Sequence, residues 1–387
     1  MHELHAILDA WRAETGPGRP GVLATVVHVK GSAYRRPGAR MLLQHDGRRI
    51  GSVSGGCLEG DLARKAWWFT EQGRPTVRVY DTSSDEDAVW EFGLGCNGVI
   101  QVLLERLDHP ATQETLTFLE HCRDARGRAV VATLIRTREG GRGEVGERLL
   151  VTPEDVAGGS LRGSALEPEL LLQAQAALHA EKSRLVRLAD CEAFVEWIGP
   201  PLPLVLFGAG HDALPVIAMA KQLGWHVTVA DGRPAYARPE RLPGADRVVV
   251  VPHHDPLQGV EVGTDSAIVL MTHNYAQDGR LLERLAALRP RYLGMLGPRD
   301  RAERLLAALP PETGELELHA PVGLDIGSET PEIIALAIVA EIQAVVSGRP
   351  GGMLRHRVGT IHPRPADSRE GIETSSGVLR PTTLVRS

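Results

Sequence analysis

The sequence of 387 residues has no long hydrophobic run, because none of its apolar stretches reaches the ~18 residues that a membrane-spanning helix needs. The first residues, MHELHAILDAWRAE, also lack the basic and then apolar layout of a secretory signal. These two absences lead us to expect a cytoplasmic protein with no membrane contact.

Cysteine and clustered positive charge are scarce as well. The cysteines are Cys57, Cys96, Cys122 and Cys191, and no two of them form a CxxC pair. This spacing argues against a zinc knuckle and against a disulfide framework. The formal net charge is -6, and no block of Lys or Arg stands out, so the basic footprint of a nucleic-acid-binding protein is absent.

The strongest positive pattern begins at Leu202. A short apolar run leads into Gly208, Gly210 and Ala213 in the spacing G-x-G-x-x-A, and a second apolar run ends at Asp231. The first glycine permits a tight turn, the second lets a pyrophosphate approach the backbone, and the small third residue lets helix pack on strand. The pattern predicts a Rossmann-type nucleotide or phosphate site. Asp231 either binds a ribose diol or simply ends the strand.

Strand-like and helix-like segments alternate over residues 203–347. The strand-like segments are 205–207, 227–230, 247–251, 267–271 and 291–296, and the helix-like segments are 211–223, 278–289, 300–308 and 331–347. This alternation predicts a fold of the α/β class, with a Rossmann-like, parallel, doubly wound sheet over 200–347. Beyond Gly348 the composition shifts to Gly, Pro, Arg, Ser and Thr, which predicts a loose tail over 348–387.

The first half of the chain has a different pattern. Strands are predicted at 22–29, 40–44, 49–53, 76–80 and 99–104, with a helix at 58–71. Residues 1–107 therefore form an α+β domain in our interpretation. A middle segment, 108–199, contains predicted helices at 114–123 and 166–180, predicted strands at 129–136, 184–188 and 193–197, and an exposed loop within the Gly-, Arg- and Glu-rich stretch 137–164.

A glycine-rich block with a thiol lies in the N-terminal domain. Gly55, Gly56, Cys57 and Glu59 stand where the helix at 58–71 is predicted to begin. A thiol at a helix N-terminus becomes a better nucleophile and a better soft-metal ligand. The alternative is a tight turn with a small buried cysteine. We interpret the other cysteines, including the Gly-flanked Cys96, as packing residues.

Basic and histidine side chains near these two blocks are candidate ligand contacts. Arg35, Arg36 and Arg40 could clamp an anion. Arg233 follows the second strand, and His211 either contacts a ligand or caps a helix. Thr272, His273 and Asn274 follow the 267–271 strand, at the carboxyl edge where open α/β sheets bind ligands. The adjacent His253 and His254 point apart on most backbones, which disfavours a metal site there.

The motifs together resemble the XdhC/CoxI family. The segments that carry the resemblance are GSAYRRPGARM, GSVSGGCLEG, FGAGHDALP, VADGRP, MTHNYAQD, LGMLGPRDR and APVGLDIGSETPEIIALAIVAEI, in this order. They cover about residues 4–107 and 200–347. One departure is Gly297-Pro298-Arg299-Asp300, where the family usually has a serine and then basic residues after the glycine.

The resemblance implies an accessory protein of molybdenum hydroxylases such as xanthine dehydrogenase. Such a protein binds molybdenum cofactor, with or without a nucleotide, permits a cysteine desulfurase to exchange an oxo for a sulfido ligand, and delivers the product to an apo-hydroxylase. In this reading Cys57 approaches the metal, the Gly208–Ala213 loop holds phosphate, and Asp231 and Arg233 read a ribose or pterin edge. The resemblance also suggests a homodimer.

Two alternatives from other classes stay open. The Rossmann pattern alone also suits an NAD(P)-dependent oxidoreductase with His273 or Asp278 as acid or base, although the Gly-Gly-Cys block would then have no role. The chain could also be a scaffold that binds no cofactor. Titration with NAD(H) and an assay for bound pterin distinguish these readings.

Overall fold

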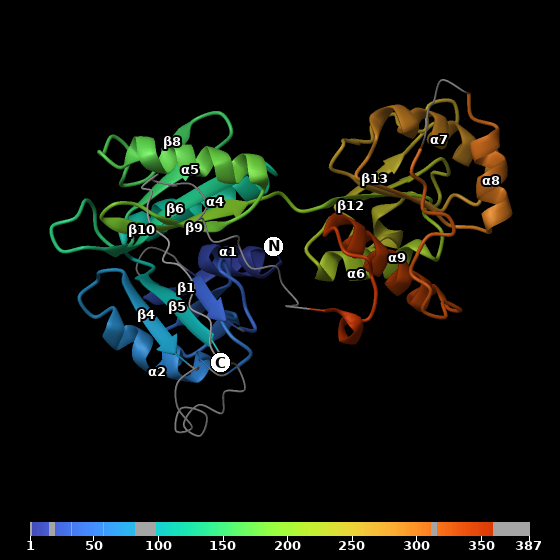
Figure 1. Ribbon diagram of the computed structural model, residues 1–387. Coiled ribbons are helices and arrows are strands. Elements are labelled where there is room, and N and C mark those ends of the chain that lie inside the picture. The colour runs from blue at the N-terminus through green and yellow to red at the C-terminus, as the bar shows by residue number, and fades with distance from the viewer. Residues whose placement is uncertain are drawn as a thin grey trace, which may run out of the picture. The chain divides into compact units, whose positions relative to one another are not determined.

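The computed structural model describes residues 2–14, 20–31, 33–56, 58–81, 98–310 and 316–358 (Figure 1). The chain divides into two compact units, one that ends at Gly351 and one that begins at Gly352. In the part of the second unit that the structure describes, residues 354–356 form a 3-10 turn, η3 (Leu354–His356). Within the described ranges, no helix combines the length and the apolar character needed to cross a membrane.

The first sheet is antiparallel and has the strand order β3-β2-β1-β5-β4. Its strands are β1 (Gly21–Gly31), β2 (Arg40–Gln44), β3 (Arg49–Gly51), β4 (Thr76–Asp81) and β5 (Gly98–Arg106), with helices α1 (His2–Glu14) and α2 (Glu59–Phe69). Side chains alternate between the two faces of a strand. Val22 and Val26 of β1 therefore pack with Leu62 of α2, whereas Leu23 packs with Leu8 of α1.

Residues 110–198 form a second antiparallel sheet with the order β8-β7-β6-β10-β9. Its elements are β6 (Ala129–Thr137), β7 (Arg148–Val151), β8 (Val156–Gly158), β9 (Arg184–Arg187), β10 (Cys191–Ile198), α4 (Pro110–Asp124) and α5 (Glu167–Ala180). Leu170 of α5 packs on one face, and Leu116 of α4 packs on the other. The stretch 137–164 was predicted to contain an exposed loop, and it also contains the buried strand β7.

Two buried ion pairs join the first sheet to the second. Arg40 of β2 donates to Glu196 of β10, with Nη1–Oε1 at 2.7 Å and Nη2–Oε2 at 2.5 Å. Arg148 of β7 pairs with Glu105 of β5 and also donates to Thr115 at 2.9 Å. Because each charge is desolvated, removing either partner of a pair would leave the other as an unpaired buried charge and would destabilise the fold.

The C-terminal sheet is parallel throughout, with the order β13-β12-β11-β14-β15. Its strands are β11 (Pro203–Phe207), β12 (His226–Asp231), β13 (Arg247–Val250), β14 (Ala267–Leu270) and β15 (Tyr292–Met295). The predicted doubly wound, Rossmann-like sheet is confirmed. The strand order reverses between β11 and β14, the position at which open α/β sheets form a ligand crevice.

Helices cover both faces of this sheet (Figure 1). Helices α6 (Ala213–Gln222) and α9 (Pro331–Val346) pack on the face of Leu204 and Leu206, and α7 (Tyr275–Leu288) and α8 (Arg299–Ala307) pack on the face of Val205 and Phe207. A short 3-10 helix, η1 (Pro239–Arg241), follows β12. Thr330 caps α9, since its Oγ1 accepts a bond from the N–H of Ile333 at 3.4 Å.

Candidate functional site

The loop after β11 has the geometry that its glycines predict. Gly208 has a φ of +123°, and a Cβ built on it would lie 2.3 Å from the carbonyl oxygen of Met271. Only glycine therefore lets the loop pass the end of β14. A Cβ on Gly210 would meet nothing within 4 Å, so its backbone is open to a ligand. Ala213, at the start of α6, is fully buried in the core of this domain.

Asp231 ends β12 and ties this loop to the next one. Its Oδ2 accepts the N–H of Ala209 at 2.7 Å and Nη2 of Arg233 at 2.7 Å. Its Oδ1 accepts the N–H and the Nε of Arg233 at 2.8 and 2.9 Å. Both carboxylate oxygens are therefore engaged within the protein.

The electrostatics of Asp231 follow from these bonds. The residue is only 4% exposed, and burial by itself raises the pKa of its carboxyl. The bonds from Arg233 and from the N–H of Ala209 outweigh burial and hold the pKa below its usual range. The guanidinium of Arg233 also lies over the ring of Tyr236, 3.9 Å from its centroid, which fixes the direction of the side chain.

A cavity of about 210 Å³ opens at this carboxyl edge of the sheet. It is lined by Gly208, Asp231, Gly232, Arg233, His253, Thr272, His273, Asn274 and Gln277. Six predicted site residues thus come together here, namely Gly208, Asp231, Arg233, Thr272, His273 and Asn274. Gly210, His211 and Ala213 lie on the same loop and helix start but do not line this cavity.

Gly232 and Gln277 were missed by the sequence analysis. A Cβ on Gly232 would lie 3.2 Å from Cε1 of His253, so a side chain there would crowd the cavity. Gln277 is nearly buried in the first turn of α7. Gly232 follows Asp231 directly, which was the available signal, whereas Gln277 offered none beyond its place in the helix.

The segment after β14 is held by side-chain bonds. His273 has a φ of +56°, and its Nε2 lies 3.5 Å from Oδ2 of Asp212 at the start of α6. Oδ1 of Asn274 accepts the N–H of Gln277 at 3.1 Å and so caps α7. The imidazole of His273 is largely exposed, which leaves it free to contact a ligand.

Asp278 has a structural environment and does not line the cavity. It is buried, accepts the hydroxyl of Thr272 at 2.5 Å, and pairs with Nη2 of Arg301 at 2.5 Å. Burial raises the pKa of Asp278 above its usual value, although the bonds from Thr272 and Arg301 oppose this. In the alternative interpretation as an acid or base, this residue would have to act from within that network.

The turn before α2 is organised by Glu59. The Oε1 atom of this buried residue accepts the hydroxyl of Ser52 at 2.8 Å and the N–H groups of Val53 and Ser54 at 3.1 and 2.8 Å. Burial by itself raises the pKa of the Glu59 carboxyl. The hydrogen bonds from Ser54 and Ser52 outweigh burial and hold that pKa below its usual range. Glu59 therefore shapes the turn that leads into Gly55. Cys57 lies outside the described residues.

Two of the three arginines proposed as an anion clamp have carboxylate partners. Arg35 pairs with Glu3, and Arg40 is buried against Glu196. In the part of the chain that the structure describes, no carboxylate lies within ion-pair distance of the exposed Arg36. Partial burial lowers the pKa of Arg36, and no neighbouring charge contributes. The clamp prediction is therefore wrong for Arg40.

The two cysteines that the structure describes lie in apolar surroundings. Cys122 and Cys191 are buried, and burial raises the pKa of the Cys122 thiol to about 11. Both are packing residues, as predicted, and Cys96 lies outside the described residues. No three His, Cys, Asp or Glu side chains gather into a metal-binding group among the residues that have described positions.

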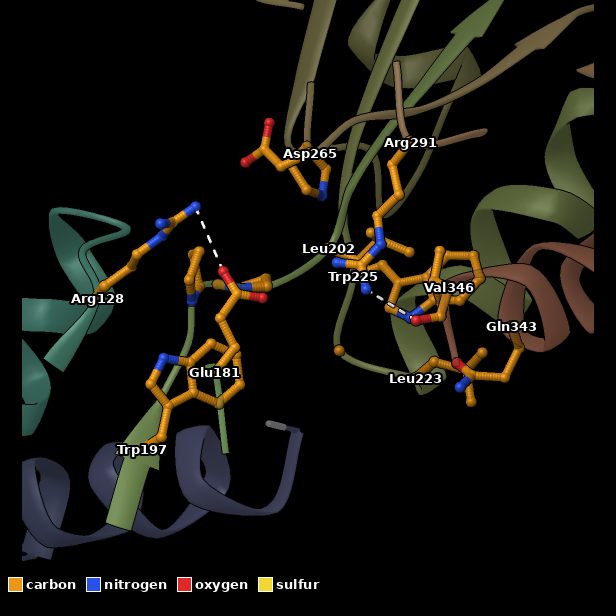
Figure 2. Close-up of a pocket in the computed structure, with 14 residues that line it drawn as sticks. Arg128, Glu181, Trp197, Leu202, Leu223, Trp225, Asp265, Arg291, Gln343 and Val346 are labelled. Atoms are coloured by element: carbon orange, nitrogen blue, oxygen red, sulfur yellow. Dashed lines mark hydrogen bonds and ion pairs between the residues drawn. The ribbon is translucent and has the colours of Figure 1, made fainter. Parts of the chain in front are cut away.

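A second cavity of about 210 Å³ lies around the connection into the C-terminal domain (Figure 2). Trp225, Arg291 and Val346 are among its lining residues, and Nη2 of Arg291 donates to the carbonyl oxygen of Val346 at 2.8 Å. None of the predicted site residues lines it. The cavity at the carboxyl edge is therefore the candidate site.

Comparison with known families gives two matches. Residues 204–342 match the model described as the XdhC Rossmann domain. Residues 15–81 and 122–189 match the model of the XdhC and CoxI family. The first match contains every lining residue of the cavity at the carboxyl edge, and the second contains the Gly-Gly-Cys block.

Individual relatives cover most of the chain. It is 34% identical to a protein of Bacillus subtilis named as a probable subunit of xanthine dehydrogenase, over 88% of this chain and 97% of that protein. It is 25% identical to the molybdenum cofactor insertion chaperone PaoD of Escherichia coli, over 85% of this chain and 84% of that protein. A crystal structure of a xanthine dehydrogenase from Bacillus halodurans matches with a TM-score of 0.74 and 32% identity, over 90% of this chain and 97% of that one.

Proposed function

Because this chain belongs to the XdhC and CoxI family, we propose that it is a molybdenum cofactor chaperone that serves a molybdenum hydroxylase such as xanthine dehydrogenase. Two relatives support an accessory role, since one is named as part of a xanthine dehydrogenase and the other as a cofactor insertion chaperone. In this proposal the cofactor is cargo that the protein binds and hands on, and the protein is an accessory rather than a catalyst.

The observation that carries the proposal is the cavity at the carboxyl edge of the parallel sheet. Molybdenum cofactor bears a phosphate, and the site offers donors for an anion. Arg233, which lines the cavity, is 46% exposed, and the imidazole of His273 is accessible. On the adjoining loop, the backbone at Gly210 is open to a ligand. Backbone N–H groups at the start of α6 add to this attraction. These groups would hold the phosphate end of the cargo.

The state of Asp231 favours this reading over NAD(P) chemistry. In a dinucleotide-binding fold the acid after the second strand accepts bonds from a ribose diol. Here Arg233 and the N–H of Ala209 already bond both oxygens of Asp231. A ribose would have to displace Arg233, whereas a phosphate could bond to that guanidinium in place. The NAD(P)-dependent oxidoreductase is therefore the second candidate.

The Gly-Gly-Cys block is proposed to support cofactor sulfuration. Cys57 would approach the molybdenum or its sulfido ligand while a cysteine desulfurase supplies the sulfur. This role has the support of the family membership and of the sequence setting, in which Cys57 follows Gly56 and precedes the start of α2. Gly56 has a φ of +110°, and a Cβ on it would meet nothing within 4 Å.

A homodimer in the cytoplasm completes the proposal. Helix α9 buries Ala335, Ile338 and Ile342 in its own domain but leaves Leu336 50% exposed. An exposed apolar side chain of this kind suits a dimer interface. Light scattering at micromolar concentration tests this part, and a monomer would contradict it.

The proposed function is tested by cofactor retention and transfer. Protein incubated with molybdenum cofactor is repurified, its pterin is released by oxidation and measured by fluorescence, and the loaded protein is then mixed with an apo-hydroxylase and a cysteine desulfurase. We expect bound pterin and active, sulfurated hydroxylase. Cys57→Ala should keep the pterin but fail to give active hydroxylase, whereas the control Cys122→Ala should behave as the wild type in transfer. Wild-type protein that retains no pterin would refute the proposal.

A further inference from the structure

A buried polar side chain with unused hydrogen-bonding capacity lines the cavity at the carboxyl edge. Gln277 is one of the lining residues and is only 6% exposed. Among the residues that the structure describes, its side-chain amide has no hydrogen-bond partner. Since the polar atoms of this amide still reach solvent although the residue is buried, the amide faces into the cavity.

The other buried polar side chains of the cavity are already engaged. Both oxygens of Asp231 accept the bonds described above. The hydroxyl of Thr272 donates to Asp278 at 2.5 Å and accepts a backbone N–H at 3.0 Å. A desolvated amide without a partner costs free energy, so such a group in a native protein usually bonds to a ligand or to a bound water. Gln277 is therefore the buried position with capacity left for a ligand.

Gln277 is held in place before any ligand arrives. It lies in the first turn of α7, where Oδ1 of Asn274 accepts its backbone N–H at 3.1 Å. The next residue, Asp278, is buried and pairs with Nη2 of Arg301 at 2.5 Å. Because the backbone on both sides of Gln277 is fixed, a ligand contact there costs less conformational entropy.

Gln277 and Arg233 come from opposite sides of the strand at the centre of the cavity. Arg233 follows β12, Gln277 follows β14, and β11 lies between these two strands. Adjacent strands lie about 4.8 Å apart, so β12 and β14 are separated by about 10 Å. A ligand whose phosphate bonds to Arg233 would therefore extend its ring system past Gly208, which also lines the cavity, toward Gln277.

We propose that Gln277 determines which heterocycle the cavity accepts, by bonding to a ring edge on which an N–H stands beside a carbonyl. A glutamine amide carries an acceptor and a donor side by side, so its carbonyl accepts the ring N–H while its NH2 group donates to the ring carbonyl. The pterin of molybdenum cofactor has such a lactam edge. This inference rests on the proposed function and adds to it a contact that selects the ring.

The test compares two probes, titrated into the full chain with pteridine fluorescence as the readout. One is the phosphate monoester of 6-hydroxymethylpterin, and the other is its 4-deoxo analogue, which lacks both the ring carbonyl and the neighbouring N–H. The wild type should bind the pterin ester at least about tenfold more tightly, as expected for two hydrogen bonds to one ring edge. Gln277→Met keeps the size of the side chain and should bind both probes equally. Gln277→Glu should also lose the preference, because a carboxylate cannot donate to the ring carbonyl.

Gln222→Met is the matched control, because Gln222 is an exposed glutamine at the end of α6. It should keep both wild-type affinities. Equal affinities of the wild type for the two probes, binding of neither probe, an undiminished preference in Gln277→Met, or an equal loss in Gln222→Met would each overturn the inference. A wild type that retains molybdenum cofactor but shows no preference between the probes would overturn it while leaving the proposed function intact.

Discussion

The guanidinium of Arg233 holds the carboxylate of Asp231, with Nε 2.9 Å from Oδ1 and Nη2 2.7 Å from Oδ2. The acid that a dinucleotide-binding fold would present to a ribose is thereby occupied by a residue only two positions further along the chain. Arg233 therefore adds a cation to the lining of the cavity, and the Asp231 oxygens that could accept bonds from a ribose diol are already engaged.

Removing Arg233 should shift the ligand preference of the crevice. Arg233→Ala frees two acceptor sites on Asp231, so the affinity for NADH should rise about tenfold, as for a hydrogen bond to a charged group. Retention of molybdenum cofactor should fall, because the phosphate loses its cation. Fluorescence titration with NADH and the pterin assay measure the two effects.

Arg238→Ala is the control for this change, since Arg238 is an exposed cation of the same domain that pairs with Glu240. It should alter neither affinity. If the wild type already binds NADH tightly and Arg233→Ala does not change this, the ion pair does not govern the choice of ligand.

The same carboxylate should make stability depend on pH. Asp231→Asn should lower the free energy of unfolding by about 1–3 kcal/mol near neutral pH. The asparagine amide offers one oxygen acceptor in place of two, so some of the buried donors around it lose their hydrogen bond. The pKa of Asp231 is lowered in the folded state from its ordinary value of 3.8. Its contribution is therefore complete above about pH 4 and is lost as the pH falls through the lowered pKa. Urea unfolding of the wild type and of Asp231→Asn, between neutral and acidic pH, measures this. The difference in their free energies of unfolding should shrink at acidic pH, and a difference that stays constant would contradict the account.

The pair of Arg40 and Glu196 should show the cost of a buried charge. Arg40→Met leaves Glu196 desolvated without a partner and should lower the stability by about 3–5 kcal/mol, whereas the double variant Arg40→Met/Glu196→Leu should recover most of this loss. The pair Arg48–Asp46 is the exposed control, at 2.7 Å, and its removal should change the stability by about 0–1 kcal/mol. Urea unfolding of the wild type, the single variant, the double variant and the control measures these changes in stability. A double variant as unstable as Arg40→Met would contradict the prediction.

The C-terminal domain could be predicted because its signals are local. Apolar runs, the glycines at 208 and 210, and the Thr330-Pro331 helix start each determine structure within a few residues. The start of α7 was placed three residues late, because Asn274 was read as a ligand contact and not as the cap of that helix. Helix caps and ligand contacts use the same residue types, so sequence alone did not separate them.

The rest depended on partners far along the chain. Strand β7 was missed because Arg148 reads as a surface residue, although Glu105 and Thr115 make its burial possible. Arg35, Arg36 and Arg40 look alike in sequence, and only Glu3 and Glu196 set them apart. The engagement of Asp231 by Arg233 depends on the direction of a side chain, which spacing does not specify.

The two glycines of the loop after β11 should respond differently to substitution. Gly208→Ala places a Cβ 2.3 Å from a carbonyl oxygen at a φ of +123°, so it should destabilise the C-terminal domain by at least about 1–3 kcal/mol. Thermal unfolding measures this loss. A variant as stable as the wild type would show that the loop can move away from the end of β14.

Gly210→Val is the most direct test of the claim that this crevice binds molybdenum cofactor. A side chain on Gly210 meets nothing within 4 Å, so the variant should fold and melt as the wild type does while it blocks the approach of a ligand to the backbone. The measurement is the pterin released after incubation with the cofactor and repurification. We predict a reduction of at least about tenfold, the equivalent of about 1.4 kcal/mol, with an unchanged melting temperature. Wild-type pterin content in a folded Gly210→Val protein would contradict the account.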